Sequence, residues 1–232
     1  MDLGAAHEEW IEEREARVWG EWGIATLAAT HWLTAEPAEL DGLPGRWHAS
    51  GGDVLGDDGL RLAPGQEAEV AGLLLRAFER DGASALRVLD PGAPAARGIS
   101  SIERFAFTEA ARLTGRVRPT ATTTETISVD GHAAASAFDA VVDLEWAGEA
   151  FSLTVQEDDG WFSAAFADAT AGRESHPFRF IRFPASAGGT VVVDFNRATL
   201  PPCAFSDHYV CVMPVPGNRW PVPIRAGERI VR

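Results

Sequence analysis

Residues 138–166 read FDAVVDLEWAGEAFSLTVQEDDGWFSAAF, and this stretch decides the expected fold. It contains three short runs of apolar and β-branched residues, which favour strands. Gly148 separates the first run from the second, and Asp158-Asp159-Gly160 separates the second from the third. An Asp-Gly pair between two strands is typical of a tight hairpin turn, and strands joined in this way pair antiparallel. The stretch therefore predicts antiparallel β structure.

The same pattern of short strands and tight turns continues on both sides of this stretch. Residues 85–89 (ALRVL) alternate in polarity and stop at Asp90-Pro91-Gly92. Because the runs are short and regularly spaced, we predict a mainly β fold, either an antiparallel sandwich or an up-and-down barrel, in preference to a parallel α/β sheet. Further runs are residues 112–118 and 122–129, with turns at Asp57-Asp58-Gly59, Arg80-Asp81-Gly82 and Asp130-Gly131.

The two ends of the chain depart from this β pattern. Residues 5–19 predict an amphipathic helix that covers a sheet, with Trp10, Ile11, Arg14 and Val18 near one face. Near the other end, residues 214–223 (PVPGNRWPVP) are rich in proline, which removes backbone donors and favours extended backbone. We expect this Pro-rich C-terminal segment to wrap a sheet edge or close one end of a barrel.

The domain organisation is expected to be simple. Residues 1–232 should form a single compact unit. Residues 91–98 (PGAPAARG) have the composition most typical of a loop in this chain, and they are the expected position of any boundary between subdomains. A sub-division there would leave residues 1–98 as the helix with a small β subdomain, and residues 99–232 as the main β subdomain.

Composition excludes several classes of function. The formal net charge of −14 repels nucleic-acid phosphates and acidic lipid, so we expect neither nucleic acid nor membrane as a partner. All 20 basic residues are arginine, which excludes lysine Schiff bases and lysine-bound pyridoxal phosphate, and we expect no cofactor. No segment approaches the roughly 18 apolar residues of a membrane span, and the acidic N-terminus is unlike a secretory signal. A cytoplasmic location is therefore expected, and the oligomeric state stays open.

Two blocks in the C-terminal half carry a distinctive set of residues. The first is Phe166-x-Asp168-x-Thr170-x-Gly172-x-Glu174, followed by Arg179; the second comprises Asp194-Phe195-Asn196-Arg197-Ala198, Pro201-Pro202-Cys203-Ala204-Phe205, Cys211, Asn218-Arg219, Pro221-Val222 and Ile224-Arg225-Ala226-Gly227-Glu228. With these blocks the chain resembles a bacterial and archaeal family known only as a domain of unknown function, serial number 1684. Weaker similarity covers residues 23–33 and 86–102. The resemblance implies a predominantly β fold and a shared site, and it implies no activity.

The first block could carry acid–base chemistry. Asp168, Glu174, His176 and Arg179 supply an acid, a base and an anion clamp within a short stretch, and a histidine beside a carboxylate can transfer protons at neutral pH. The alternative is structural: Asp168 would begin an Asx-type turn, with Gly172 at a positive φ. The family usually shows Thr-Tyr where this chain has Ser175-His176.

The second block suggests a polar site at a strand end. Asp194, Asn196 and Arg197 follow the apolar run at residues 191–193. Guanidinium groups bind carboxylate or phosphate bidentately, so four arginines of the two blocks are candidate ligand-binding residues. They are Arg179, Arg197, Arg219 and Arg225. The alternative is an internal salt-bridge frame in which Asp194, Glu174 and Glu228 pair with these arginines.

The two cysteines, Cys203 and Cys211, are expected to be reduced thiols. Cys203 could act as a nucleophile if His176 served as its base. A metal site that also used His208 and His176 is weakly supported, because the chain lacks a second cysteine pair, and we expect no metal. The leading interpretation of each cysteine is a buried structural thiol.

Three functions remain open from the sequence. The first is a small-molecule-binding β protein whose pocket holds an anionic or carbonyl-bearing ligand through its arginines. The second is an enzyme that uses His176 with Asp168 or Glu174 for acid–base chemistry, or Cys203 as a nucleophile. The third is a structural or partner-binding scaffold in which the two blocks form a latch.

Overall fold

The computed structural model describes residues 2–186 and 189–232. The chain divides into two compact units. Unit 1 comprises Met1–Arg14, Ser100–Ala204 and Val210–Arg232; unit 2 comprises Glu15–Ile99 and Phe205–Tyr209. The boundary between Ile99 and Ser100 follows the expected loop, of which residues Ala93–Ala96 form a short helix, α2. Two short pieces depart from a simple division at that loop, because residues 1–14 cluster with unit 1 and residues 205–209 with unit 2.

The predicted N-terminal helix is confirmed. Helix α1 spans Leu3–Trp19, which adds two residues to the expected start. His7 and Arg14 are buried and lie seven residues, or two helical turns, apart on one face. Among the residues that the structure describes, no helix is both long and apolar enough to cross a membrane.

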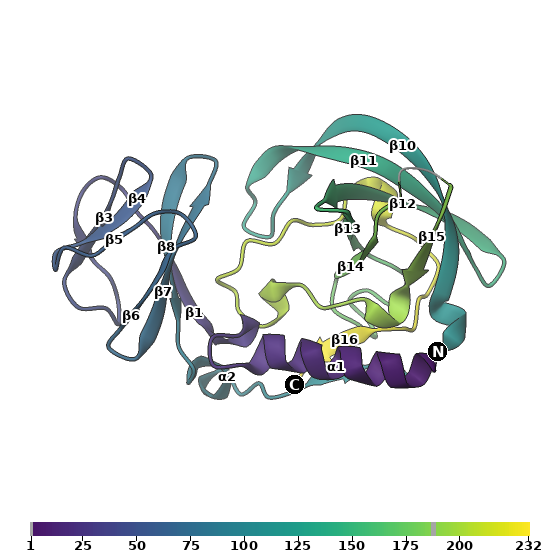
Figure 1. Ribbon diagram of the computed structural model, residues 1–232, viewed down its shortest axis with the longest axis horizontal. Coiled ribbons are helices and arrows are strands. Elements are labelled where there is room, and N and C mark those ends of the chain that lie inside the picture. Colours follow the sequence, from purple (N-terminus) through teal and green to yellow (C-terminus); the bar gives the residue numbers. More distant parts are fainter. Residues whose placement is uncertain (1, 187–188) are drawn as a thin grey trace. The chain divides into compact units, whose positions relative to one another are not determined.

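Unit 1 is built on a six-stranded antiparallel sheet that curves into a half-barrel (Figure 1). Its order is β14-β13-β12-β11-β10-β15, so consecutive strands pair with each other and β15 returns to the edge beside β10. The strands are β10 (Arg112–Ile127), β11 (Ala133–Trp146), β12 (Glu149–Asp158), β13 (Trp161–Phe166), β14 (Arg179–Pro184) and β15 (Gly189–Asp194). A separate pair joins β9 (Ile102–Arg104) to β16 (Glu228–Val231). The expected mainly β, antiparallel fold is thus confirmed.

The tight turns that decide this topology have the geometry that their sequences favour. Ala147 and Gly148 join β11 to β12 with φ values of 52° and 83°, and Asp159 and Gly160 join β12 to β13 with φ values of 49° and 75°. Positive φ at both central residues is the type I′ arrangement, whose twist matches that of the flanking strands. The two strands expected at residues 112–118 and 122–129 are joined in the single long strand β10, which ends at Ile127 and has a register shift between Pro119 and Thr122.

The C-terminal tail completes the core of unit 1. Alternate residues Trp220, Val222, Ile224 and Ala226 are buried in the same apolar cluster as β11 and β12, which is the period of extended backbone. The Trp220 ring stacks on Phe166 with centroids 5.5 Å apart. The Pro-rich segment therefore closes the half-barrel, as predicted.

Unit 2 contains two four-stranded antiparallel sheets with a shared core. The first has the order β1-β8-β7-β6 and the second β2-β3-β4-β5. Trp47 and Val54 from the second sheet are buried in one cluster with Leu75 and Leu86 from the first. The strands are β1 (Leu27–Trp32), β2 (Ala38–Glu39), β3 (Arg46–Ser50), β4 (Asp53–Gly56), β5 (Arg61–Leu62), β6 (Glu67–Val70), β7 (Leu73–Arg80) and β8 (Ala83–Leu89).

Short 3-10 helices connect several of these elements. In unit 2, η1 (Ile24–Thr26) precedes β1. In unit 1, η2 (Glu109–Ala111) precedes β10, η3 (Phe195–Arg197) follows β15, and η4 (Pro202–Ala204) and η5 (Pro216–Asn218) lie in the tail.

Candidate functional site

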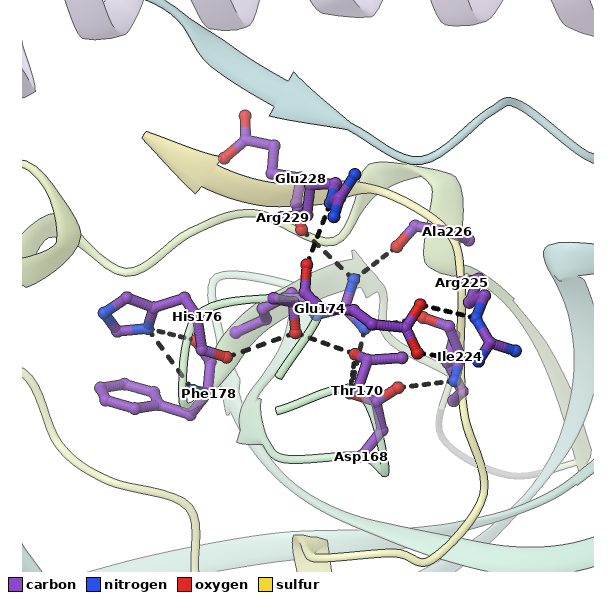
Figure 2. A network of polar contacts seen from close by, with 12 residues as sticks. Asp168, Thr170, Glu174, His176, Phe178, Ile224, Arg225, Ala226, Glu228 and Arg229 are labelled. Carbon is purple, nitrogen blue, oxygen red and sulfur yellow. Dashed lines mark hydrogen bonds and ion pairs between the residues drawn. The ribbon is translucent and has the colours of Figure 1, made fainter. Parts of the chain in front are cut away.

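The first sequence block folds as a loop between β13 and β14, and a buried ion pair lies at its centre (Figure 2). The Arg179 Nη2 donates to Asp168 Oδ1 over 3.2 Å, and each side chain is only 1% exposed. Thr170 Oγ1 also donates to Asp168 Oδ1, at 2.8 Å, and Gly172 has a φ of +70°. The Ala171 amide donates to the Asp168 carbonyl oxygen at 3.0 Å, so the turn at Asp168 is closed by the backbone and the Thr170 hydroxyl and is not the foreseen Asx-type turn, whereas the left-handed Gly172 is as foreseen.

The same ion pair fastens the tail by its backbone. The Ile224 amide donates to Asp168 Oδ2 at 2.5 Å. Arg179 donates to the carbonyl oxygens of Ile224 at 2.8 Å, Ala226 at 2.5 Å and Glu228 at 3.3 Å. Burial lowers the pKa of Arg179 and the adjacent Asp168 raises it, but the guanidinium remains charged because its ordinary pKa is so high. The pair is thus engaged with the protein's own chain.

Glu174 and Arg225 form a second ion pair, at the surface of the same loop and tail. Arg225 donates from Nε and Nη2 to the two carboxylate oxygens of Glu174, at 2.8 and 2.7 Å. This hydrogen bonding lowers the pKa of Glu174. The Glu174 side chain is 38% exposed and that of Arg225 is 57% exposed, so this is a surface pair. Arg229 Nε donates to the Glu174 carbonyl oxygen at 3.0 Å, which ties the loop to β16.

His176 is directed away from the carboxylates (Figure 2). Its Nδ1 lies 2.9 Å from the Phe178 carbonyl oxygen, which favours the tautomer with the proton on Nδ1. The imidazole packs edge-on against the Phe178 ring, with centroids 5.3 Å apart. Burial lowers the pKa of His176. Within residues 2–186 and 189–232, the structure brings neither Asp168 nor Glu174 into hydrogen-bond contact with this imidazole.

The strand end after β15 is held by side chains of the second block. Asp194 Oδ1 accepts hydrogen bonds from the Asn196 amide at 3.1 Å and the Asn196 side chain at 2.8 Å, which caps η3. Asn196 is buried and bonds both backbone groups of Thr108, donating to its carbonyl at 2.9 Å and accepting from its amide at 3.1 Å. Asp194 Oδ2 also pairs with Arg112 Nε at 3.4 Å. These residues therefore join η3 to the segment before β10.

The remaining candidates lie apart from this network. Arg197 and Arg219 are exposed, and their guanidiniums make no hydrogen bond or ion pair with the rest of the described chain. Cys203 is half-buried and Cys211 is buried, both as thiols, and the Cys203 amide lies 3.3 Å from Cys211 Sγ. In the described ranges, no three His, Cys, Asp or Glu side chains gather as metal ligands.

Two anchors of the tail differ from what the sequence predicted: Glu228 was expected to pair with one of the four candidate arginines and pairs with Arg14 instead, and Asn218 was given no role. Glu228 is fully buried and accepts from Arg14 Nε at 2.9 Å, Arg14 Nη2 at 3.1 Å and the Leu200 amide at 2.7 Å. Asn218 bonds the amide and carbonyl of Thr154 at 2.8 and 2.9 Å and the Ala165 carbonyl at 3.0 Å. The presence of Arg14 on the apolar face of the predicted helix was the signal that could have identified the partner of Glu228.

Comparison with known proteins gives a family and no activity. Among solved structures, an uncharacterized protein of Haloarcula marismortui, determined by solution NMR, is similar over 58% of this chain and 78% of its own, with 23% identity and a TM-score of 0.48. No curated protein matches the chain. A family model described as "Protein of unknown function (DUF1684)" matches residues 98–229, which is more than half of the sequence and includes both blocks. The chain therefore belongs to this family of unknown function.

Proposed function

We propose that this protein works by binding a macromolecular partner and that the Asp168–Arg179 network is a structural latch for its tail. The observation that carries the proposal is that the buried ion pair is bonded to the backbone of the tail. Besides bonding Asp168, Arg179 donates to three carbonyl oxygens of residues 224–228, while its side chain is 1% exposed. An anion clamp must offer its donors to a ligand, whereas both terminal nitrogens of Arg179 donate to the chain itself.

The exposed tryptophans support a role in partner binding. Trp32 is 40% exposed and Trp161 is 39% exposed. Each has an arginine over its ring, Arg80 at 4.7 Å and Arg182 at 4.9 Å from the respective centroid. Tryptophan and arginine are the residue types that dominate the energetics of protein interfaces. Such pairs present a large apolar area with a charged edge.

A small anionic ligand is the second candidate. It is favoured by Arg197 and Arg219, which are exposed and make no hydrogen bond or ion pair in the part of the chain that the structure describes. The enzyme alternative has less support. It needs His176 to share a proton with a carboxylate, and the Nδ1 of His176 instead lies 2.9 Å from a backbone carbonyl.

A thermal-shift screen separates these functions. The wild-type protein would be heated with carboxylates, phosphates, nucleotides and divalent metals. A ligand at a hundredfold excess over its Kd stabilises the folded state by roughly 2.7 kcal/mol, which such a screen detects. We expect no compound to give a shift that disappears in the Arg197→Ser/Arg219→Ser double variant.

The matched control is Arg173→Ser, which removes another exposed arginine of unit 1. A shift that is retained in this control and lost in the double variant would replace the scaffold proposal by small-molecule binding. Turnover of any compound that produced a shift, lost in His176→Asn or Cys203→Ala, would replace it by catalysis.

A further inference from the structure

The two cysteines of the chain lie next to each other in the folded protein. The Cys203 amide donates to Cys211 Sγ over 3.3 Å, and both residues are thiols. Because the N–Cα bond is only about 1.5 Å long, the Cα of Cys203 lies no more than about 4.8 Å from Cys211 Sγ. The Cys203 sulfur is joined to this Cα through Cβ alone. Rotation of one side chain about its Cα–Cβ bond can therefore bring the two sulfurs together.

The backbone at each cysteine is held by its own hydrogen bond. The Ala204 amide closes η4 around Cys203 by donating to the Pro201 carbonyl oxygen at 2.9 Å. The Cys211 carbonyl oxygen accepts from the Val129 amide at 2.9 Å, just beyond the end of β10. Both cysteines belong to unit 1. The fold thus keeps the two thiols close by bonds that are independent of any link between the sulfurs.

The segment between the cysteines is short and is fixed near both of its ends. Residues 205–209 belong to unit 2. Phe205 is 2% exposed, and its ring packs edge-on against Trp19 with centroids 5.9 Å apart. The Tyr209 hydroxyl donates to the Ile24 carbonyl oxygen at 3.0 Å. A covalent bond between the flanking cysteines would restrict the conformations that this segment can adopt when these contacts break.

The two thiols differ in exposure in the way that a stepwise oxidation requires. Cys203 is half-buried, so an oxidant in solution can reach it. Cys211 is buried, with an exposure of 8%. Because access from solvent is one of the properties that select a reactive cysteine, Cys203 is the expected attacking thiol. Cys211 is then the resolving thiol beside it.

We propose that Cys203 and Cys211 form a reversible disulfide, with a small-molecule disulfide as the oxidant. This modification site goes beyond the partner-binding function proposed above and does not depend on it. The Cys203 thiolate attacks one sulfur of the oxidant, breaks its S–S bond and releases one small-molecule thiolate. The Cys211 thiolate then attacks the Cys203 sulfur of the mixed disulfide and releases the second. Two cysteine thiols are oxidised, one disulfide is reduced, and the cysteine protons pass to the released thiolates.

The exposure of Cys203 makes the bond reversible. A reducing thiol can reach this sulfur from solution as the oxidant does, and disulfides that are accessible in this way are the labile ones. In a reducing compartment the pair would stay as thiols, and a shift to oxidising conditions would close the bond. The segment 204–210 is therefore covalently closed in one redox state and open in the other.

The test measures the equilibrium of the wild-type protein with reduced and oxidised glutathione, in buffer and in denaturing urea. The fold holds the thiols near each other, whereas the unfolded chain must close a loop to bring them together. We expect the equilibrium constant for disulfide formation to be at least about tenfold larger in the folded protein, because the effective concentration of one thiol at the other is higher. An equal or smaller constant in the folded protein overturns the proposal.

Tryptic digestion identifies the product. Trypsin cleaves after Arg197 and Arg219, so residues 198–219 form one peptide that contains both cysteines. After alkylation of any remaining thiols, the expected peptide is unalkylated and lighter than its reduced form by two hydrogen atoms. A peptide that stays glutathionylated on Cys203, or a disulfide-linked dimer of the chain, overturns the proposal, because Cys211 would then fail to resolve the mixed disulfide.

Each single variant retains one thiol and serves as the matched control for the other. Cys211→Ser should stop at the mixed disulfide on Cys203. Cys203→Ser should react with oxidised glutathione several-fold more slowly than Cys211→Ser, because its remaining thiol is buried. The opposite order of reactivity would overturn the assigned roles. The wild-type equilibrium decides the proposal even where circular dichroism finds a variant unfolded.

Hydrogen exchange tests the consequence for the loop. Amides of residues 204–210 should exchange several-fold more slowly in the oxidised protein than in the reduced protein, because the bond limits local opening. The Cys203→Ser/Cys211→Ser double variant should show no difference between the two conditions. Equal exchange in the oxidised and reduced wild type overturns the closure of the loop. None of these measurements uses the ligand screen, so the failure of this proposal and that of the scaffold function are distinguishable.

Discussion

Asp168 and Arg179 are a buried ion pair whose N–O distance is 3.2 Å, and both side chains are 1% exposed. Between them they bond the backbone of Ile224, Ala226 and Glu228, so one charged pair holds the end of the chain against β14. Buried ion pairs add little net stability, but removal of one partner leaves an uncompensated charge in the core.

Arg179→Met is therefore expected to lower the free energy of unfolding by about 3–5 kcal/mol. Asp168 would lose its counter-ion, and three tail carbonyls would lose a donor. Urea denaturation measures the change. Arg225→Met is the control, because its pair with Glu174 is exposed and screened by solvent, so its loss should change the stability far less. Equal losses in the two variants would contradict the latch.

Gly227→Ala should be far more disruptive than Gly172→Ala. Both glycines have positive φ, 77° and 70°, so each substitution carries a backbone cost of about 1–2 kcal/mol. At Gly227 an added Cβ would also lie 2.6 Å from the carbonyl oxygens of Phe195 and Ala198, whereas at Gly172 it meets open space. We expect a loss of more than about 3 kcal/mol at Gly227, measured by thermal unfolding. Similar melting temperatures for the two variants would count against this packing.

His176 should make stability fall on the acidic side of neutrality. Burial lowers its folded-state pKa below 6.5, so the unfolded chain binds the proton more readily. The neutral imidazole contributes stability that is fully present above pH 6.5 and is lost as the pH falls through the folded pKa. In His176→Gln this part of the pH dependence should disappear from urea denaturation curves. An NMR titration of the His176 ring that gave a pKa above 6.5 would refute the prediction.

The Asp143 carboxylate should stabilise the folded protein at neutral pH and lose this effect in strong acid. Hydrogen bonds from Arg118 and Ser152 lower its pKa from 3.8 to about 2, so its contribution is present above pH 3.8 and is lost as the pH falls to about 2. Because the side chain is 38% exposed, solvent screening limits the effect to about 1 kcal/mol or less.

Asp143→Asn should therefore be less stable than the wild type near neutral pH and similar to it near pH 2, as measured by urea denaturation. Glu145→Gln, an exposed neighbour on β11, serves as the control and should not change the profile. A constant difference between Asp143→Asn and the wild type across this pH range would rule out the linkage.

The sequence by itself determined the β class, the hairpins and the period of the tail. Gly148 and Asp159-Gly160 form the expected turns because positive φ costs little at glycine and aspartate, and a two-residue turn leaves its strands only one way to pair. Helix α1 and the alternate burial of Trp220, Val222 and Ile224 follow from local periodicity in the same way. These features depend on neighbouring residues alone.

Only the tertiary structure decided which partners the polar side chains bond. Asp168, Glu174, His176 and Arg179 are close in sequence, which was compatible with either a catalytic cluster or a frame. Asp168 and Arg179 meet as an ion pair, whereas Glu174 and His176 are directed elsewhere, because partners from distant segments select each rotamer: the tail bonds Arg179 and Asp168, and Arg225 bonds Glu174. The same holds for Arg14 and Glu228, 214 residues apart. Such pairings arise from strand register and chain closure, whereas sequence spacing specifies only local geometry.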